Sequence, residues 1–159
     1  MFYTKLFGAL AKHEVRYLLV GGLAVNLYGI PRMTMDVDLA LALDPANVER
    51  FIAAAADLAL FPVVPEPVAS LADPGRRRAW IEEKNLIAFA MRTAEPAAPT
   101  VAILIGTTID FEAAFARRLT RELDGMPISL AAVADLIELK EHTGRAQDAA
   151  DVAQLRKLG

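Results

Sequence analysis

Apolar residues along this chain follow two patterns: the three- to four-residue spacing of amphipathic helices and the short continuous runs of buried strands. In the first third they predict, in order, a helix over 2–12 ("FYTKLFGALAK"), a strand over 16–22 ("RYLLVGG"), a helix over 23–29 ("LAVNLYG") and a strand over 34–43 ("TMDVDLALAL"). Asp44 followed by Pro45 is typical of an N-cap and first helical position, so we expect a helix to continue to about Asp57.

The segment 60–75, "LFPVVPEPVASLADPG", is dense in proline and predicts an irregular, mobile excursion, a lid or a linker. Beyond it we predict a helix over 76–85, strands over 86–92 and 100–106 that form a hairpin beside the first two strands, a helix over 109–119, a turn over 122–127, and helices over 130–143 and 146–158. Trp80 is expected to anchor the core.

The composition narrows the classes of protein to consider. With 159 residues, the chain is expected to form a single domain, 1–159. It is 55% hydrophobic, but no apolar run approaches the roughly 20 residues of a membrane helix, and its start lacks a secretory signal. We therefore expect a cytoplasmic protein with no membrane partner. The absence of cysteine and the presence of only two histidines argue against a zinc site, and we read His13 and His142 as ordinary surface or helix-end residues. A net charge of -3 argues against a broad nucleic-acid surface and favours a compact anion as the partner.

Two aspartates interrupt the apolar strand over 34–43. Asp36 and Asp38 are two residues apart, so both point to the same face, with their backbones roughly 6.5 to 7 Å apart. Two neighbouring carboxylates repel and would cost several kcal/mol to bury without partners. A bound cation resolves this, and oxygen ligands on a rigid strand suit Mg²⁺ or Mn²⁺. The pair is therefore a candidate catalytic metal site.

A glycine pair precedes these carboxylates. Gly21 and Gly22 end one predicted strand and begin a helix, where backbone N–H groups and the helix dipole can bind an anion. A side chain at Gly22 would keep a phosphate away, while Arg32 and Thr34 are placed to reach the same pocket. The sequence lacks the dinucleotide-binding G-x-G-x-x-G pattern and the G-K-[ST] of a P-loop, so we expect neither a Rossmann dinucleotide site nor a P-loop.

The order "GG", "LAVNLYGIPRMTM" and "DVD" resembles the DNA polymerase beta superfamily of nucleotidyltransferases, and is most similar to its minimal and AbiEii-like members from bacterial toxin-antitoxin systems. The tail "DLIELKEHTGRAQDAADVAQL" extends the resemblance across nearly the whole chain. The resemblance implies an α+β nucleotidyltransferase fold with a small mixed sheet, flanking helices and a helical C-terminal segment. It also implies Mg²⁺-dependent transfer of a nucleoside monophosphate from a nucleoside triphosphate to a hydroxyl group on tRNA, a protein or a small molecule. A cognate toxin or antitoxin would be a further partner.

Under this resemblance Asp36 and Asp38 are metal ligands, and Gly21 and Gly22 hold the triphosphate together with Arg32 and Thr34. Lys140 and Arg145, in the tail, are further candidate nucleotide contacts. Ion pairing within and between the last two helices accounts for these two tail residues equally well.

The sequence departs from the family pattern at one position. The family places a third carboxylate on a later strand, where this chain has Ala102. Asp110 shares the parity of Ala102, but an unbroken strand would carry it roughly 26 Å away, and only a bend near Gly106 would return it as a metal ligand. Without a third carboxylate, the chain is alternatively a degenerate member of the fold that binds nucleotide or a partner protein without catalysis.

Overall fold

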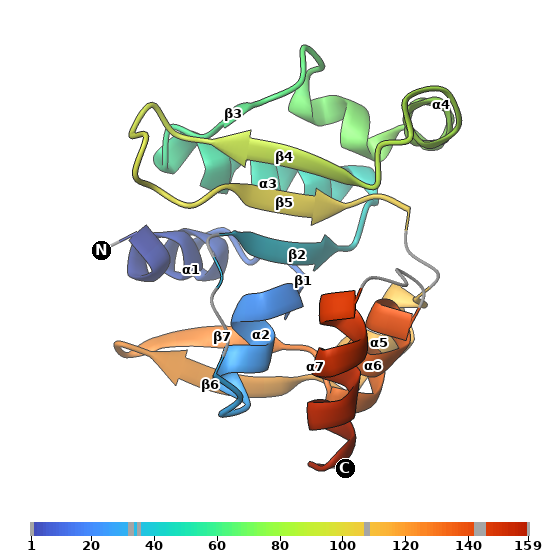
Figure 1. The fold of residues 1–159 in the computed structure, drawn as a ribbon. Helices are drawn as coiled ribbons and strands as arrows, with labels where there is room; N and C mark the ends of the chain where they lie inside the picture. Colours follow the sequence, from blue (N-terminus) through green and yellow to red (C-terminus); the bar gives the residue numbers. More distant parts are fainter. Residues whose placement is uncertain (1, 32–33, 35, 107–108, 142–145, 159) are drawn as a thin grey trace.

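A seven-stranded mixed sheet forms the centre of the computed structural model, which describes the chain apart from residues 1, 32–33, 35, 107–108, 142–145 and 159 (Figure 1). The strand order is β3-β4-β5-β2-β1-β7-β6. The strands are β1 (Tyr17–Val20), β2 (Val37–Leu41), β3 (Phe61–Pro62), β4 (Ala88–Arg92), β5 (Val101–Leu104), β6 (Leu119–Leu123) and β7 (Met126–Leu130). The pairs β1–β7 and β2–β5 are parallel and the other four are antiparallel, so the expected α+β architecture with a mixed sheet is confirmed.

Helices flank this sheet on both sides (Figure 1). They are α1 (Phe2–Lys12), α2 (Gly21–Leu27), α3 (Pro45–Asp57), the 3-10 helix η1 (Val68–Ala72), α4 (Pro74–Lys84), α5 (Phe111–Ala116), α6 (Val133–Glu141) and α7 (Ala146–Arg156). In the view of Figure 1, α1 and α3 lie behind the sheet, while α2 and α7 lie in front of it. Helix α3 contacts α1 and η1, and η1 contacts α4, so these elements form one layer.

Short polar signals set the helix starts. Asp44 accepts a hydrogen bond from the Asn47 N–H at 3.1 Å and precedes Pro45, so the expected N-cap of α3 is confirmed. Asp73 caps α4 in the same way, through the N–H groups of the two residues that follow Pro74. Each cap satisfies N–H groups of a first helical turn that have no partner within the helix.

The proline-rich segment 60–75 contains a strand and a 3-10 helix, which corrects its interpretation as an irregular excursion. Its start forms β3, an edge strand beside β4, and its middle forms η1. Leu71 in η1 is fully buried, where η1 contacts α3 and α4. Proline is tolerated on an edge strand, and the apolar residues between the prolines anchor the segment to the core.

A second hairpin, β6–β7, occupies the region expected to hold only a turn and the start of a helix. Asp124 and Gly125 both have positive φ, as the two-residue hairpin turn requires, and β7 carries Ile128 and Leu130 into the core. The following helix α6 therefore begins at Val133, later than expected. The Asp-Gly pair was the available signal, but the exposed strand β6 has no apolar period to accompany it.

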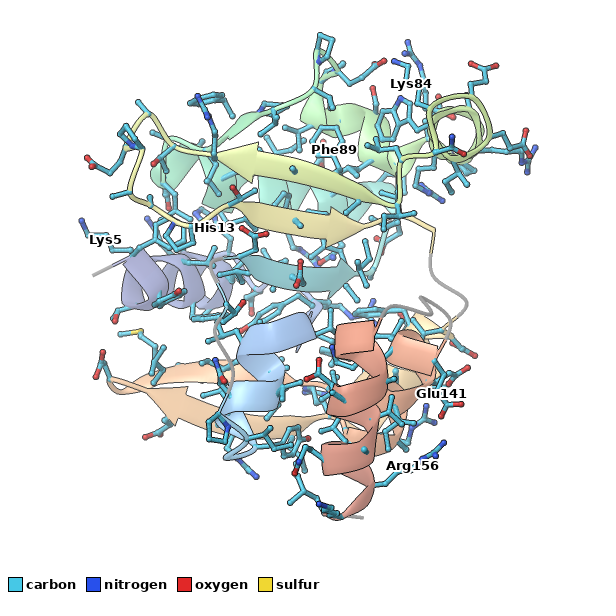
Figure 2. The ribbon with its side chains drawn as sticks, viewed as in Figure 1. Lys5, His13, Lys84, Phe89, Glu141 and Arg156 are labelled. Atoms are coloured by element: carbon cyan, nitrogen blue, oxygen red, sulfur yellow. The ribbon has the colours of Figure 1, made fainter. Side chains whose placement is uncertain are left out.

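The main core lies between the sheet and the layer of α1, α3 and α4. Trp80 of α4 is 2% exposed and stacks on Phe89 of β4 with ring centroids 5.4 Å apart, so the expected anchoring role is confirmed. Figure 2 shows Phe89 inside the fold, with Lys84 and Arg156 at its periphery. No helix within the described ranges is both long and apolar enough to span a bilayer.

Candidate active site

A close approach in the candidate site joins the glycine turn to the second aspartate. Gly21 follows β1 directly and opens α2 with φ +73°, a left-handed conformation that favours glycine. A Cβ atom at this position would lie 2.1 Å from Asp38 Oδ2 and 2.8 Å from its Cγ. The carboxylate of Asp38 therefore rests against the start of α2. A close approach that requires a glycine thus occurs at Gly21, and Gly22 is buried in the first turn of α2.

The strand register explains how Asp38 reaches this position. β1 and β2 are antiparallel neighbours in which Val20 is the partner of Asp38, so the last residue of β1 lies beside the carboxylate. Val20 is also the N-cap of α2 and offers no side-chain acceptor to the first turn. The N–H groups at Gly21 and Gly22 thus have no capping side chain from the preceding residue.

Asp36 lies just before β2 and is exposed, whereas Asp38 is half-buried. Between them, the Val37 N–H donates to the carbonyl of Thr100 at 2.8 Å, which fixes this part of the backbone against the strand beside it. The two-residue spacing predicts that both carboxylates lie on the same face of the sheet. Thr34 donates from Oγ1 to the Asp36 carbonyl at 3.3 Å, so its hydroxyl bonds the backbone that leads into the site. Arg32, the other residue expected here, lies outside the described residues.

Ala102 is the direct neighbour of Asp38 on the next strand. β5 runs parallel to β2 with Asp38 and Ala102 as register partners, and Ala102 is in turn the partner of Ala90 on β4. Residues in register share a face, so two alanines continue the row that Asp38 begins. The position expected to carry a third carboxylate thus lies beside the second one and carries a methyl group.

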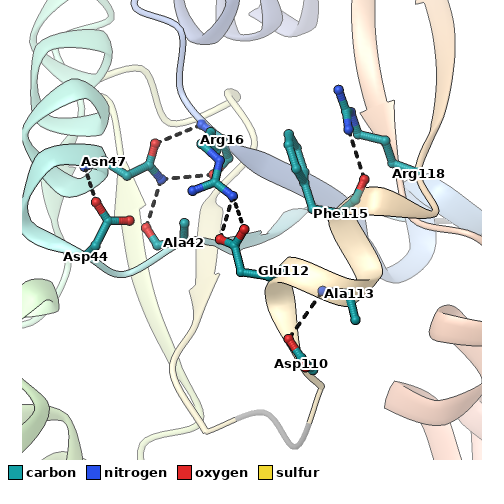
Figure 3. Close-up of polar contacts among 9 residues, drawn as sticks. All are labelled: Arg16, Ala42, Asp44, Asn47, Asp110, Glu112, Ala113, Phe115 and Arg118. Atoms are coloured by element: carbon teal, nitrogen blue, oxygen red, sulfur yellow. Dashed lines mark hydrogen bonds and ion pairs between the residues drawn. The ribbon is translucent and has the colours of Figure 1, made fainter.

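Asp110, the candidate third ligand that only a bend near Gly106 would return to this group, is the residue before α5 in the structure. Its carboxylate accepts a hydrogen bond from the Ala113 N–H at 3.2 Å as the N-cap of α5 (Figure 3). Over the described ranges, no three histidine, aspartate or glutamate side chains lie close enough to hold a metal ion together. The short helix α5 begins immediately after Asp110, and the N-cap directs the carboxylate to that helix.

The C-terminal residues of the sequence pattern form ion pairs between helices. Lys140 of α6 lies 2.9 Å from Asp151 of α7, and both side chains are buried. Asp135 of α6, 2% exposed, receives two hydrogen bonds from Arg117, at 2.6 and 3.2 Å. These hydrogen bonds raise the pKa of the Arg117 guanidinium above its usual value. The pairs support the structural explanation for Lys140, while Arg145 lies outside the described residues.

A second polar cluster, missed by sequence reasoning, lies where β1, β2 and α3 meet (Figure 3). The buried Asn47 side chain accepts from the Arg16 N–H at 2.8 Å and donates to the carbonyls of Arg16 and Ala42 at 2.9 and 2.8 Å. The guanidinium of Arg16 pairs with Glu112 and lies over the Phe115 ring, 5.2 Å from its centroid. These contacts fix the ends of the two central strands, and an asparagine on the apolar side of a helix was the only sequence signal for them.

Solved structures provide the comparison that decides the fold. The lincosamide antibiotic adenylyltransferase LnuA, solved with lincomycin bound, superposes with a TM-score of 0.61 and 16% identity over 99% of this chain and 95% of that chain. A Thermotoga maritima protein described as a nucleotidyltransferase gives 0.59 and 13% over 99% and 92%. An antigenic nucleotidyltransferase-like protein from Paracoccidioides brasiliensis gives 0.57 and 17% over 99% and 75%.

The chain has a nucleotidyltransferase fold. At the level of sequence, no family model matches it and no curated protein is significantly similar to it. Structural similarity at sequence identities of 13 to 17% supports the fold alone, so the AbiEii-like subtype stays a prediction.

Proposed function

We propose that this protein is a Mg²⁺-dependent nucleotidyltransferase that moves a nucleoside monophosphate from a nucleoside triphosphate to a hydroxyl group. The observation that carries the proposal is the contact of the Asp38 carboxylate with Gly21, at the start of the helix where a phosphate would bind. Asp36 contributes a second carboxylate to the same face. A metal ligand thus lies next to the proposed triphosphate cradle, as phosphoryl transfer requires.

The two carboxylates fit a magnesium ion by their chemistry. Mg²⁺ prefers hard oxygen ligands, is commonly held by one or two carboxylates, and completes its shell with water and substrate phosphates. Asp36 is exposed and Asp38 is half-buried, so both can be reached from solvent. When bound there, Mg²⁺ would supply charge neutralisation to the transferring phosphoryl group. Mn²⁺ satisfies the same donor set.

The remaining residues of the chain would bind and orient the nucleotide. The N–H groups of Gly21 and Gly22 would donate to phosphate oxygens. Because Gly21 has no side chain, the Asp38 carboxylate has room to lie beside these N–H groups. Thr34 would hold the backbone before Asp36 in place. Arg32 and Arg145 remain candidate phosphate contacts by prediction, and we give Lys140 a structural role because of its buried pair with Asp151.

Several classes of molecule are candidates for the acceptor of the nucleoside monophosphate. The resemblance implies tRNA, a protein or a small molecule, and the likeness to an adenylyltransferase of lincosamide antibiotics adds a concrete small-molecule test case. A toxin-antitoxin setting, with a cognate protein partner, remains a prediction from the resemblance.

A second candidate function is nucleotide or partner binding without transfer, and the observation that favours it is Ala102 beside Asp38. A carboxylate at this position could assist the incoming hydroxyl group, whereas a methyl group cannot accept its proton. Binding through Asp36, Asp38 and the glycine turn would be retained in such a protein.

One set of variants separates the two functions. The wild-type protein, Asp36→Asn/Asp38→Asn and Ala102→Asp are incubated with Mg²⁺, each labelled triphosphate in turn, and tRNA, cell-extract protein or lincomycin as acceptor. Glu49→Gln, an exposed acid on α3 behind the sheet, is the matched control for removal of negative charge. Triphosphate binding is measured in parallel by calorimetry with and without Mg²⁺.

Label transfer by the wild type and by Glu49→Gln, lost in the double variant, is the result expected for the enzyme. Transfer only by Ala102→Asp would contradict the enzyme and support binding without catalysis. Metal-dependent triphosphate binding that persists unchanged in Asp36→Asn/Asp38→Asn would overturn the assignment of the site itself.

A further inference from the structure

The two edges of the seven-stranded sheet are built differently. One edge is β3, which has only two residues, Phe61 and Pro62, and is thus short and carries a proline, two common ways of closing an edge. The opposite edge is β6, Leu119–Leu123, with five residues, no proline and four exposed positions (Figure 1). An edge of this length without proline can pair with another strand, and its charged side chains limit which strands fit.

The hairpin register shows which backbone groups of β6 face away from β7. The turn Asp124–Gly125 joins Leu123 to Met126, and Glu122 is the partner of Pro127, which has no N–H group to donate. Because hydrogen-bonded and non-hydrogen-bonded pairs alternate, residues 119, 121 and 123 direct their N–H and C=O groups to β7. Thr120 and Glu122 direct theirs outward. Arg118 precedes the strand, and its N–H donates to the carbonyl of Phe115 at 3.2 Å.

We propose that β6 pairs antiparallel with β6 of a second copy of this chain, with Thr120 opposite Thr120 on the two-fold axis. In this register Arg118 of each copy lies opposite Glu122 of the other, so two complementary charge pairs form by symmetry. Thr120 and Glu122 have outward-facing backbone groups, so the pair at Thr120 is hydrogen-bonded, whereas Arg118, just before β6, meets Glu122 through its side-chain charge. The two sheets then form one continuous sheet.

The charges on β6 and on Arg118 just before it favour this register over those centred on Arg121 and Glu122. A two-fold axis perpendicular to the sheet keeps the corresponding faces of the two copies on the same side. Each such axis places one residue of β6 directly opposite the same residue of the second copy. An axis at Arg121 would place two arginines opposite each other, and an axis at Glu122 would do the same for two glutamates. Like charges directly opposite are destabilising, whereas threonine pairs and opposite charges stabilise neighbouring strands.

Side chains next to the axis fit the same arrangement. Leu119 is 38% exposed and would lie opposite Arg121 of the second copy, whose methylene stem can cover it. Arg118 donates to the carbonyl of Phe115 at 2.9 Å, and its guanidinium lies 3.9 Å from the centroid of the Phe115 ring (Figure 3). This stacking holds the cation beside the edge before the second copy binds. The inference is independent of the proposed transferase activity.

The test is the molar mass in solution, measured by sedimentation equilibrium over a dilution series. Wild-type protein is expected at twice the 17.2 kDa of one chain. Arg118→Glu and Glu122→Arg each turn both charge pairs repulsive and should raise the dimer dissociation constant by roughly tenfold or more. Mixing these two variants restores both attractions, as does the double exchange Arg118→Glu/Glu122→Arg in one chain. Glu49→Arg, on α3, is the control charge reversal and should remain dimeric.

Circular dichroism melting confirms that each variant is folded before its mass is read. A wild-type protein that is monomeric at every concentration overturns the proposal. So does a dimer that both single reversals leave unchanged, since it must use another surface. Folded single variants that stay monomeric when mixed overturn the Thr120-centred register.

Discussion

Replacing Gly21 with alanine tests the contact on which the candidate site depends. The substitution adds one methyl group, which would lie 2.1 Å from Asp38 Oδ2 and 2.9 Å from its Cβ. It also places an L-residue at φ +73°. The conformational cost alone is about 1 to 2 kcal/mol. The overlap adds about 1 to 3 kcal/mol, because the carboxylate or the start of α2 must move.

Gly29→Ala provides a matched control for this prediction. Gly29 has φ +88°, and no atom lies within 4 Å of a Cβ built on it, so the substitution carries the conformational cost without the overlap. We expect Gly29→Ala to lower the free energy of unfolding by about 1 to 2 kcal/mol and Gly21→Ala by about 2 to 5 kcal/mol. The difference between the two variants measures the overlap with Asp38.

The assay is equilibrium unfolding in urea followed by fluorescence of Trp80, the single tryptophan, which is 2% exposed. Asp38→Ala removes the two atoms closest to the added methyl group. The substitution at Gly21 should therefore cost less in the Asp38→Ala background, with a coupling of about 1 to 3 kcal/mol. Equal destabilisation by Gly21→Ala and Gly29→Ala, or additive effects of Gly21→Ala and Asp38→Ala, would refute the contact.

Three further substitutions test other parts of the fold. Asn47→Ala removes three hydrogen bonds to backbone groups and should lower the free energy of unfolding by about 3 kcal/mol in a urea titration; a loss below about 1 kcal/mol would contradict the role of this amide. Asp57, whose pKa is held below its ordinary value of 3.8 by hydrogen bonds from His13 and then Lys12, adds stability that is present above pH 3.8 and lost as the pH falls through the lowered pKa. The melting temperature of Asp57→Asn should therefore lie below wild type at pH 7 and converge with it in acid, and an equal gap at both pH values would be inconsistent with this linkage. Asp151→Ala leaves the buried ammonium of Lys140 without that carboxylate and should cost about 3 to 5 kcal/mol, whereas the apolar replacement of both members should recover most of the loss. Chemical denaturation of the single and double variants would decide this, and a double variant as unstable as the single one would argue against the pair.

The elements that sequence predicted well are those with strong local signals. Helix α1 has a clear apolar period, and its observed bounds Phe2–Lys12 match the expectation. Helix α3 is bounded at its start by Asp44 and Pro45, and its observed end is Asp57. The elements that were missed depend on tertiary partners. β3 exists because β4 offers it an edge, and the exposed strand β6 exists because the turn at Gly125 folds it onto β7.

The site shows the same division between local and non-local information. The alternation of side chains along a strand predicts one face for Asp36 and Asp38, and in the structure β2 begins between them, at Val37. The contact between Asp38 and Gly21 could not be predicted, because it depends on the register that makes Val20 the partner of Asp38. Asp110 was weighed by its distance along an extended strand, while its actual position is set by the helix that it caps.

The alanine at position 102 has a clearer meaning once the register is known. In sequence, Ala102 is one small residue in an apolar run, and its correspondence to a carboxylate position was an alignment by resemblance. In the structure it is the register partner of Asp38 on an adjacent parallel strand. A carboxylate introduced there would start from the same face as Asp38, at the spacing of neighbouring strands, about 4.8 Å. In Ala102→Asp, backbone geometry alone therefore places a carboxylate beside Asp38. A gain or absence of transfer in that variant then reports on the chemistry of the site and not on a misplaced side chain.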